Sequence, residues 1–218
     1  MRNNKRAGRE TARLQAPRGF FQALRAAERE LAPLSRDALS PAAGWLTDNA
    51  RQLRQKARAL EKSVRRTEPL PALDGEPRVS VLAKKILSHE GVLRAEDILT
   101  ESAAFEREHS PLSEAELCSL QDALCAACLK DVKTAALSCA GEAAAAREAA
   151  RVFARVRKGN FSRLPNVCGT VEALKKMLDR AGDRRTLALL NAHLESRSLV
   201  PETNGPRETL RLLRLGVL

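Results

Sequence analysis

Residues 113–132, SEAELCSLQDALCAACLKDV, decide the expected fold because they combine a helix start with a long apolar stripe. Ser113 and Glu116 have the spacing of a capping box, in which each side chain accepts a hydrogen bond from the other residue's backbone amide. The apolar positions that follow recur every three or four residues and predict one buried helix face; they are Leu117, Leu120, Leu124, Cys128 and Val132. The alanine-rich run at 141–150 either continues this helix or turns once.

Helical patterns are also found on both sides of this stretch. Ser40 followed by Pro41 is a strong start signal, because serine caps free amides and proline fits the first turn. We expect helices at 20–31, 41–66, 78–88, 95–108, 170–180, 184–196 and 206–215. Residues 69–77, PLPALDGEP, cannot be helical throughout and are expected to form an ordered linker. No alternating strand pattern is visible, so the predicted class is all-α, a bundle or array of about seven to eight helices with no sheet.

Positive charge is concentrated at the front of the chain. The formal net charge is +11; residues 1–66 carry 16 Lys or Arg against 6 Asp or Glu, and the remainder carries 22 against 21. We therefore expect a basic, disordered tail over 1–18 and a basic helical segment over 19–68. A helical core segment over 69–158 and a C-terminal helical segment over 159–218 follow, and the ending at Leu218 fits a truncated reading frame.

Neither export nor membrane insertion is indicated by the composition. The N-terminal residues MRNNKRAGRE are basic but lack an apolar stretch, and no window reaches the roughly 18 apolar residues of a membrane span. The five cysteines are odd in number, which argues against a disulfide framework and favours a reducing cytoplasm. We expect Cys118, Cys125 and Cys128 to be small core residues of one helix rather than a zinc or redox site.

Catalytic motifs are absent from the sequence. It contains no glycine-rich phosphate loop, no serine nucleophile elbow and no Asp-x-Asp pair, so we expect no catalytic residue, cofactor or metal site in this chain. His89, His109 and His193 are scattered at predicted helix ends, where they suit capping or surface roles. The basic residues of 51–66 could follow a phosphate backbone, but few aromatics accompany them, so nucleic acid is not the favoured partner.

Four sequence signals in a fixed order resemble the amino-terminal region of cyclic β-1,2-glucan synthases, which are large bacterial membrane enzymes. They are residues 40–49 (SPAAGWLTDN), 70–79 (LPALDGEPRV), 87–93 (LSHEGVL) and 111–117 (PLSEAEL). Cys118 stands where the family usually has Trp, and Phe105 lies one residue from its common Tyr. The resemblance implies packing positions at Trp45, Leu46, Asp48, Asn49, Pro71, Gly75, Arg78, His89, Pro111, Glu116 and Leu117.

This resemblance implies a parent enzyme that polymerises glucose from UDP-glucose and cyclises the chains at the bacterial inner membrane. The family's glycosyltransferase signatures and membrane spans are absent here, so the expected function is that of a non-catalytic helical segment, either a fragment or a split subunit. Its expected partner is the downstream transferase and membrane domain of the same enzyme, and its expected location is the cytoplasmic side of the inner membrane. The basic front end would suit that anionic surface. The alternative is a free-standing basic adaptor that binds nucleic acid or anionic membrane through residues 1–66.

Overall fold

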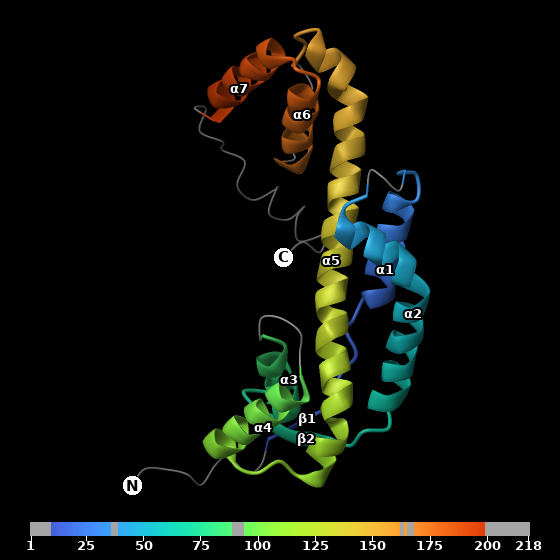
Figure 1. Cartoon of the computed structure of the whole chain (residues 1–218), viewed down its shortest axis with the longest axis vertical. Coiled ribbons are helices and arrows are strands. Elements are labelled where there is room, and N and C mark those ends of the chain that lie inside the picture. Colours follow the sequence, from blue (N-terminus) through green and yellow to red (C-terminus); the bar gives the residue numbers. More distant parts are fainter. Residues whose placement is uncertain (1–9, 36–38, 89–93, 162–163, 165–167, 199–218) are drawn as a thin grey trace. The chain divides into compact units, whose positions relative to one another are not determined.

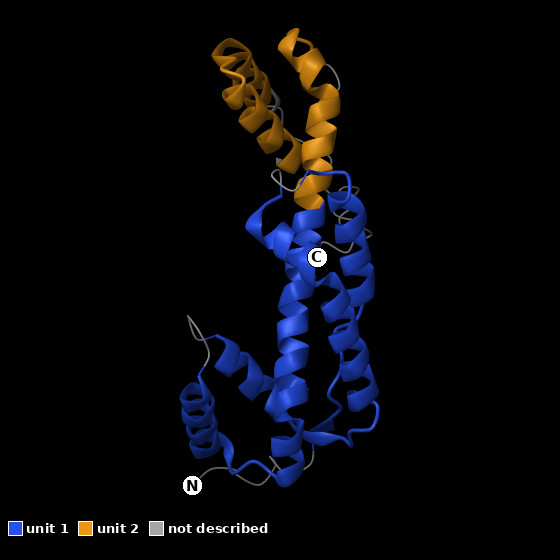
Figure 2. Cartoon of the chain, turned by 45° about the vertical axis from the view of Figure 1, so that its right-hand side comes forward, with its two compact units in different colours: residues 1–140 blue, residues 141–218 orange. Residues whose placement is uncertain are grey.

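The computed structural model describes residues 10–35, 39–88, 94–161, 164 and 168–198 (Figure 1). This described part contains seven helices and three short strands, and the chain divides into two compact units, residues 1–140 and 141–218 (Figure 2). Among the described residues, no helix combines the length and the apolar character that crossing a bilayer requires. The seven helices confirm the mostly helical character that the sequence predicts.

The first two helices of unit 1 begin at the residues that the sequence indicates. Helix α1 covers Phe20–Leu31 and follows Gly19, whose φ of 73° lies in the left-handed region that glycine tolerates. Helix α2 covers Pro41–Val64, and the Ser40 hydroxyl oxygen accepts a hydrogen bond from the Ala43 amide at 3.3 Å. The Ser-Pro start signal is thus confirmed.

The expectation of no sheet is wrong. Strands β1 (Thr11–Ala12), β2 (Leu70–Leu73) and β3 (Glu76–Pro77) form an antiparallel sheet in the order β1-β2-β3. Thr11 pairs with Pro71, and Leu73 pairs with Glu76. Such short strands give no readable alternation, but the Asp74-Gly75 turn, with φ of 52° and 80°, has the two left-handed residues of a tight hairpin.

Part of the expected disordered tail belongs to this sheet. In residues 10–18, Thr11–Ala12 form β1, and Leu14 is buried against Leu70 and Val79. The described part of the tail is therefore ordered and not disordered as expected, because its backbone forms hydrogen bonds with β2. Residues 1–9 and the helix expected at 206–215 lie outside the described residues.

Three more helices contribute to unit 1, and the longest of them continues beyond it. Helices α3 (Arg78–Leu87) and α4 (Ala95–His109) lie along one side of α5 (Glu114–Arg157), and α1 and α2 lie along another (Figures 1 and 2). Residues of α5 therefore belong to a core with α1 and α2 and to a second core with α3 and the strands.

The predicted apolar stripe of α5 is only partly correct. Leu120, Leu124 and Val132 are partly buried, but Leu117 and Cys128 are exposed. The fully buried positions of α5 are instead mostly small residues, which allow close approach of neighbouring backbones; in unit 1 they include Ala123, Ala136, Cys139 and Ala140. The helix continues without interruption through the alanine-rich run to Arg157.

Unit 2 is a separate helical cluster. Helices α6 (Cys168–Arg180) and α7 (Arg184–Ser198) pack Leu174, Leu178 and Leu190 against the end of α5. The Asp183 carboxylate accepts a hydrogen bond from the Thr186 amide at 3.2 Å, and this bond lowers the pKa of that carboxyl. Asp183 thus caps the start of α7.

Candidate functional site: a buried ion pair and a cationic cavity

Arg78, the first residue of α3, joins three helices of unit 1. Its Nε lies 3.7 Å from Glu116 Oε1 at the start of α5, and its Nη2 donates a hydrogen bond of 2.7 Å to the Ser110 carbonyl after α4. Its guanidinium carbon lies 5.8 Å from the centre of the Phe105 ring, which is within cation–π range. The two side chains of the ion pair are 13% and 1% exposed, so this is a buried pair.

Glu116 also starts its own helix. Its Oε2 accepts hydrogen bonds of 2.9 Å from both the amide and the hydroxyl of Ser113, and the Ser113 hydroxyl oxygen accepts one from the Glu116 amide at 3.3 Å. The predicted capping box is confirmed. One carboxylate therefore caps α5 and, through its other oxygen, compensates the positive charge that Arg78 places at the N-terminus of α3.

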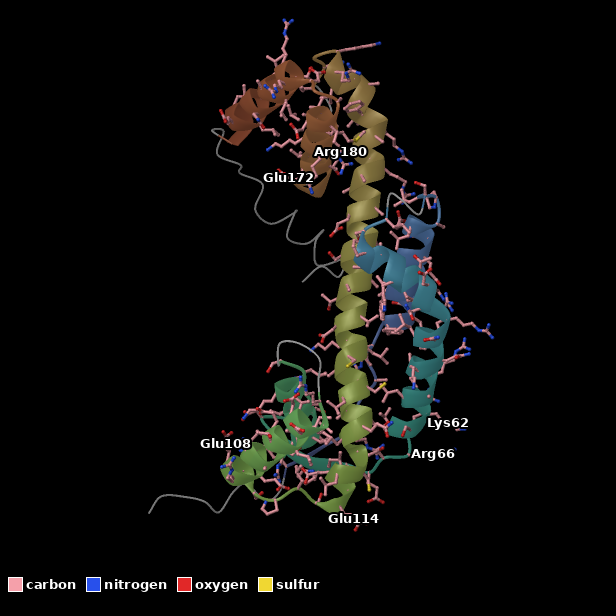
Figure 3. The ribbon with its side chains drawn as sticks, in the orientation of Figure 1. Lys62, Arg66, Glu108, Glu114, Glu172 and Arg180 are labelled. Atoms are coloured by element: carbon pink, nitrogen blue, oxygen red, sulfur yellow. The ribbon has the colours of Figure 1, made fainter. Side chains whose placement is uncertain are left out.

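Around this junction, the polar groups face protein rather than an open cleft. The Leu112 amide donates to Glu106 at 2.9 Å, and at the surface the Lys85 ammonium donates to the Glu108 carboxylate at the same distance. The hydrogen bond from Lys85 lowers the pKa of Glu108, which lies near the end of α4 (Figure 3). Such an arrangement holds these helices in place.

The other resemblance positions are spread over unit 1. On α2, Leu46 is 2% exposed, whereas Trp45 beside it is 51% exposed. Leu117 is 53% exposed because it lies about 100° around α5 from the buried Glu116. These two side chains do not pack in the core of unit 1 and leave apolar surface open. The remaining positions are Asp48, Asn49 and Pro111 on the surface, Gly75 in the hairpin turn and Pro71 in β2, while His89 lies outside the described residues.

The cysteines of α5 differ from the expectation of core packing. Cys139 is buried and Cys125 is half-buried against the α1–α2 core, but Cys118 and Cys128 are exposed. Burial raises the pKa of the Cys125 thiol, and the nearby Cys128 and Asp122 raise it further. Partial burial of its sulfur and the charge of Asp131 also raise the pKa of Cys128. The side chain of Cys168 lies outside the described part.

We predict that iodoacetamide at pH 7.5 labels Cys118 before Cys128, although both residues are exposed, and Cys125 last. The thiolate is the reacting species, and the raised pKa of Cys125 and Cys128 lowers the fraction of each thiol that is ionised at that pH. Their labelling rates should rise about tenfold for each pH unit until the pKa is passed. Peptide mass spectrometry over time measures this order, and Cys125 reacting first would contradict it.

The described histidines form aromatic contacts. His109 lies 3.6 Å from Glu108, its ring centre is 4.6 Å from that of Phe105, and it is the last residue of α4. His193 stacks on Phe161 with ring centres 5.3 Å apart. Within the ranges that the structure describes, no group of three or more His, Cys, Asp or Glu residues converges as metal ligands would.

A cationic stripe runs along the exposed face of α2. It consists of Arg51, Arg58 and Lys62 on α2 and of Arg65 directly after it, and their spacing of seven, four and three residues places them on one side of a helix. None of the four forms an ion pair with another residue of the described ranges, whereas Arg54 beside them pairs with Glu28. Figure 3 shows Lys62 near the C-terminal end of α2 and Arg66 just beyond it.

A cavity of about 450 Å³ is the feature that sequence reasoning missed. It lies among the segment after β1, the β2–β3 turn, α3 and α5, and is lined by Arg13, Arg18, Lys84, Lys130 and Lys133 together with one acid, Glu76. The Glu76 carboxylate pairs with Lys84. These residues come from three segments far apart in sequence, 12–18, 75–84 and 123–133, and no local motif connects them.

A comparison of the chain with protein-family models, curated proteins and solved structures finds no match. The resemblance to cyclic β-1,2-glucan synthases therefore depends on the residues of this sequence alone.

Proposed function

We propose that this chain is a non-catalytic helical segment, a fragment or a subunit, of a cyclic β-1,2-glucan synthase-like membrane glycosyltransferase that uses UDP-glucose. The observation that carries the proposal is the order of the four sequence signals, two of which supply Arg78 and Glu116. These two residues form the buried ion pair that ties α3 to α5. The chemistry of the parent enzyme then belongs to a transferase and membrane domain outside this chain.

Exposed apolar side chains favour docking as the role of this segment. Trp45 and Leu117 are each more than half exposed, and both belong to the resembling stretches. Aromatic and apolar side chains that would otherwise face water are typical anchors of protein interfaces. In this proposal they contact the transferase domain on the cytoplasmic side of the bacterial inner membrane.

Co-isolation tests the docking role. A tagged chain, expressed in the cell that encodes it, should recover a polytopic glycosyltransferase from detergent-solubilised membranes, identified by mass spectrometry. A Trp45→Ala/Leu117→Ala variant should recover at least about tenfold less, since each lost anchor costs an interface more than 1 kcal/mol. Leu189→Ala, at an exposed leucine of unit 2, is the matched control. Equal recovery by all three chains, or none by any, would contradict docking through these residues.

A second candidate function is a free-standing basic helical adaptor for nucleic acid or anionic membrane. The observation that favours it is the stripe of four exposed cations on and directly after α2. Each well-placed cation contributes about 1 kcal/mol at an anionic membrane surface.

If the stripe binds such a surface, we predict that replacing all four residues by Gln weakens binding to phosphatidylserine vesicles by at least about tenfold. Sedimentation with the vesicles measures the loss, and neutral phosphatidylcholine vesicles are the control. A parallel titration of duplex DNA at increasing salt tests the nucleic-acid form of the hypothesis, since phosphate contacts weaken as salt rises. The adaptor hypothesis would be excluded if no binding were detected, or if neither the substitutions nor the salt concentration changed the binding.

A further inference from the structure

The cationic cavity of unit 1 lies where the segment after β1, a hairpin turn, α3 and α5 meet, and four of its five cations, all but Lys133, are exposed. Ser80 and Lys84 lie one turn apart on α3, and Ala123, Ala126, Ala127, Lys130 and Lys133 follow one face of α5. The hairpin turn, with Gly75 at a φ of 80°, and the segment 12–18 close the other sides. Its volume falls in the range of about 300–1,000 Å³ that is typical of small-molecule sites.

The charge of the lining is strongly unbalanced. Five Lys or Arg and one Glu give a formal charge of +4, and the Glu is already paired with Lys84. Arg13, Arg18, Lys130 and Lys133 form no ion pair with any residue that the structure describes. Like charges gathered around one cavity repel one another, and a multivalent anion would relieve that repulsion.

The start of α1 adds a second positive feature beside Lys133. A Cβ placed on Gly19 would lie 3.9 Å from the Lys133 Nζ, so this half-buried ammonium lies against the N-terminal end of the helix. That end has no side-chain cap and no acidic residue in its first turn. The N-terminal end of α1 does not line the cavity, but its dipole and the nearby Lys133 both favour an anion there.

The lining also limits the kind of anion. None of the described lining residues is aromatic, so the cavity offers no ring on which a nucleobase would stack. Guanidinium groups, ammonium groups and a serine hydroxyl are all donors, and they suit the several oxygens of a phosphate better than a single carboxylate. The cavity is partly open to solvent, and its volume of about 450 Å³ suits a compact ligand.

We infer that this cavity is a binding site for a small ligand bearing a phosphate or diphosphate group, held by Arg13, Arg18, Lys130 and Lys133. This site is independent of the proposed function, because it requires neither the parent enzyme nor docking through Trp45 and Leu117. A free diphosphate and the phosphate ester of a small metabolite present the same chemistry to these residues.

Titration calorimetry of the full chain with inorganic pyrophosphate tests the inference, and glucose 1-phosphate as a second probe separates an ester from the free anion. We expect saturable binding of one pyrophosphate per chain. Lys130→Gln/Lys133→Gln should weaken it by at least about tenfold, since charge-assisted hydrogen bonds are the strong ones. Lys130→Arg/Lys133→Arg should retain binding, because it keeps both charges.

Arg58→Gln/Lys62→Gln is the matched control, since it removes the same charge from the exposed face of α2. This variant should change the affinity less than about twofold, because neither residue lines the cavity and salt screens exposed charges. Circular dichroism verifies that each variant is folded. Equal weakening by both double variants would show non-specific attraction and overturn the inference, as would the absence of saturable binding by the unaltered chain at millimolar pyrophosphate.

Discussion

Replacing Phe105 by alanine should lower the free energy of unfolding of unit 1 by about 3–5 kcal/mol. Its ring is 0% exposed and packs with Leu82, Ile86 and Leu112, which come from α3 and from the turn before α5. The substitution would leave a cavity that these neighbours cannot fill, and it would remove the ring beneath Arg78 and Lys85. Chemical unfolding followed by the fluorescence of Trp45, the single tryptophan and a residue of unit 1, measures the loss.

Two control variants test whether the loss of stability comes from the buried ring of Phe105. Phe105→Leu keeps most of the apolar volume and should cost less than half as much as alanine. Leu99→Ala lies on the same helix at a side chain that is 70% exposed, so it should change stability by no more than about 0.5 kcal/mol. If Phe105→Ala were as mild as Leu99→Ala, α4 would not be packed on α3 as the structure has it.

Glu116→Ala should also destabilise unit 1 by about 3–5 kcal/mol, because it leaves the buried Arg78 without its counter-charge. The same change removes the capping box at Ser113, which by itself is worth about 1 kcal/mol. Glu116→Gln keeps an oxygen that can accept from Ser113 but loses the charge, so it should give an intermediate value. The same fluorescence-detected unfolding measures both variants.

A double-mutant cycle separates the ion pair from the cap. Arg78→Ala combined with Glu116→Ala should cost less than the sum of the two single changes, by about 1–3 kcal/mol. The exposed pair of Glu148 and Arg151, at 3.2 Å, is the control, and Glu148→Ala should cost no more than about 1 kcal/mol. Additive effects at Arg78 and Glu116 would mean that the two side chains do not interact in solution.

The helices could be predicted because each has a local signal. Ser40-Pro41 and the Ser113–Glu116 box mark helix starts by hydrogen bonds within a few residues, and both are present in the structure. The sheet could not be predicted from periodicity, because strands of two to four residues do not repeat a pattern. The Asp74-Gly75 dipeptide was its one readable signal.

The ion pair and the cavity depend on contacts between residues that are far apart in sequence. They are therefore harder to predict from the sequence than the helices are. Arg78 and Glu116 were identified only as separate positions of a resemblance, and their pairing requires α3 and α5 to be side by side. The apolar stripe of α5 was misplaced because its neighbours pack against alanines as well as leucines. The cationic cavity needs three distant segments to converge, which no window of the sequence contains.

We propose that the chemistry associated with this segment is carried by another part of a membrane glucan synthase. The most direct measurement is the DNA sequence downstream of the Leu218 codon, read far enough to include the neighbouring genes and checked for frameshifts. The proposal predicts a reading frame, continuous, frameshifted or adjacent, that encodes membrane spans and glycosyltransferase motifs. A complete surrounding sequence without such a frame would contradict it.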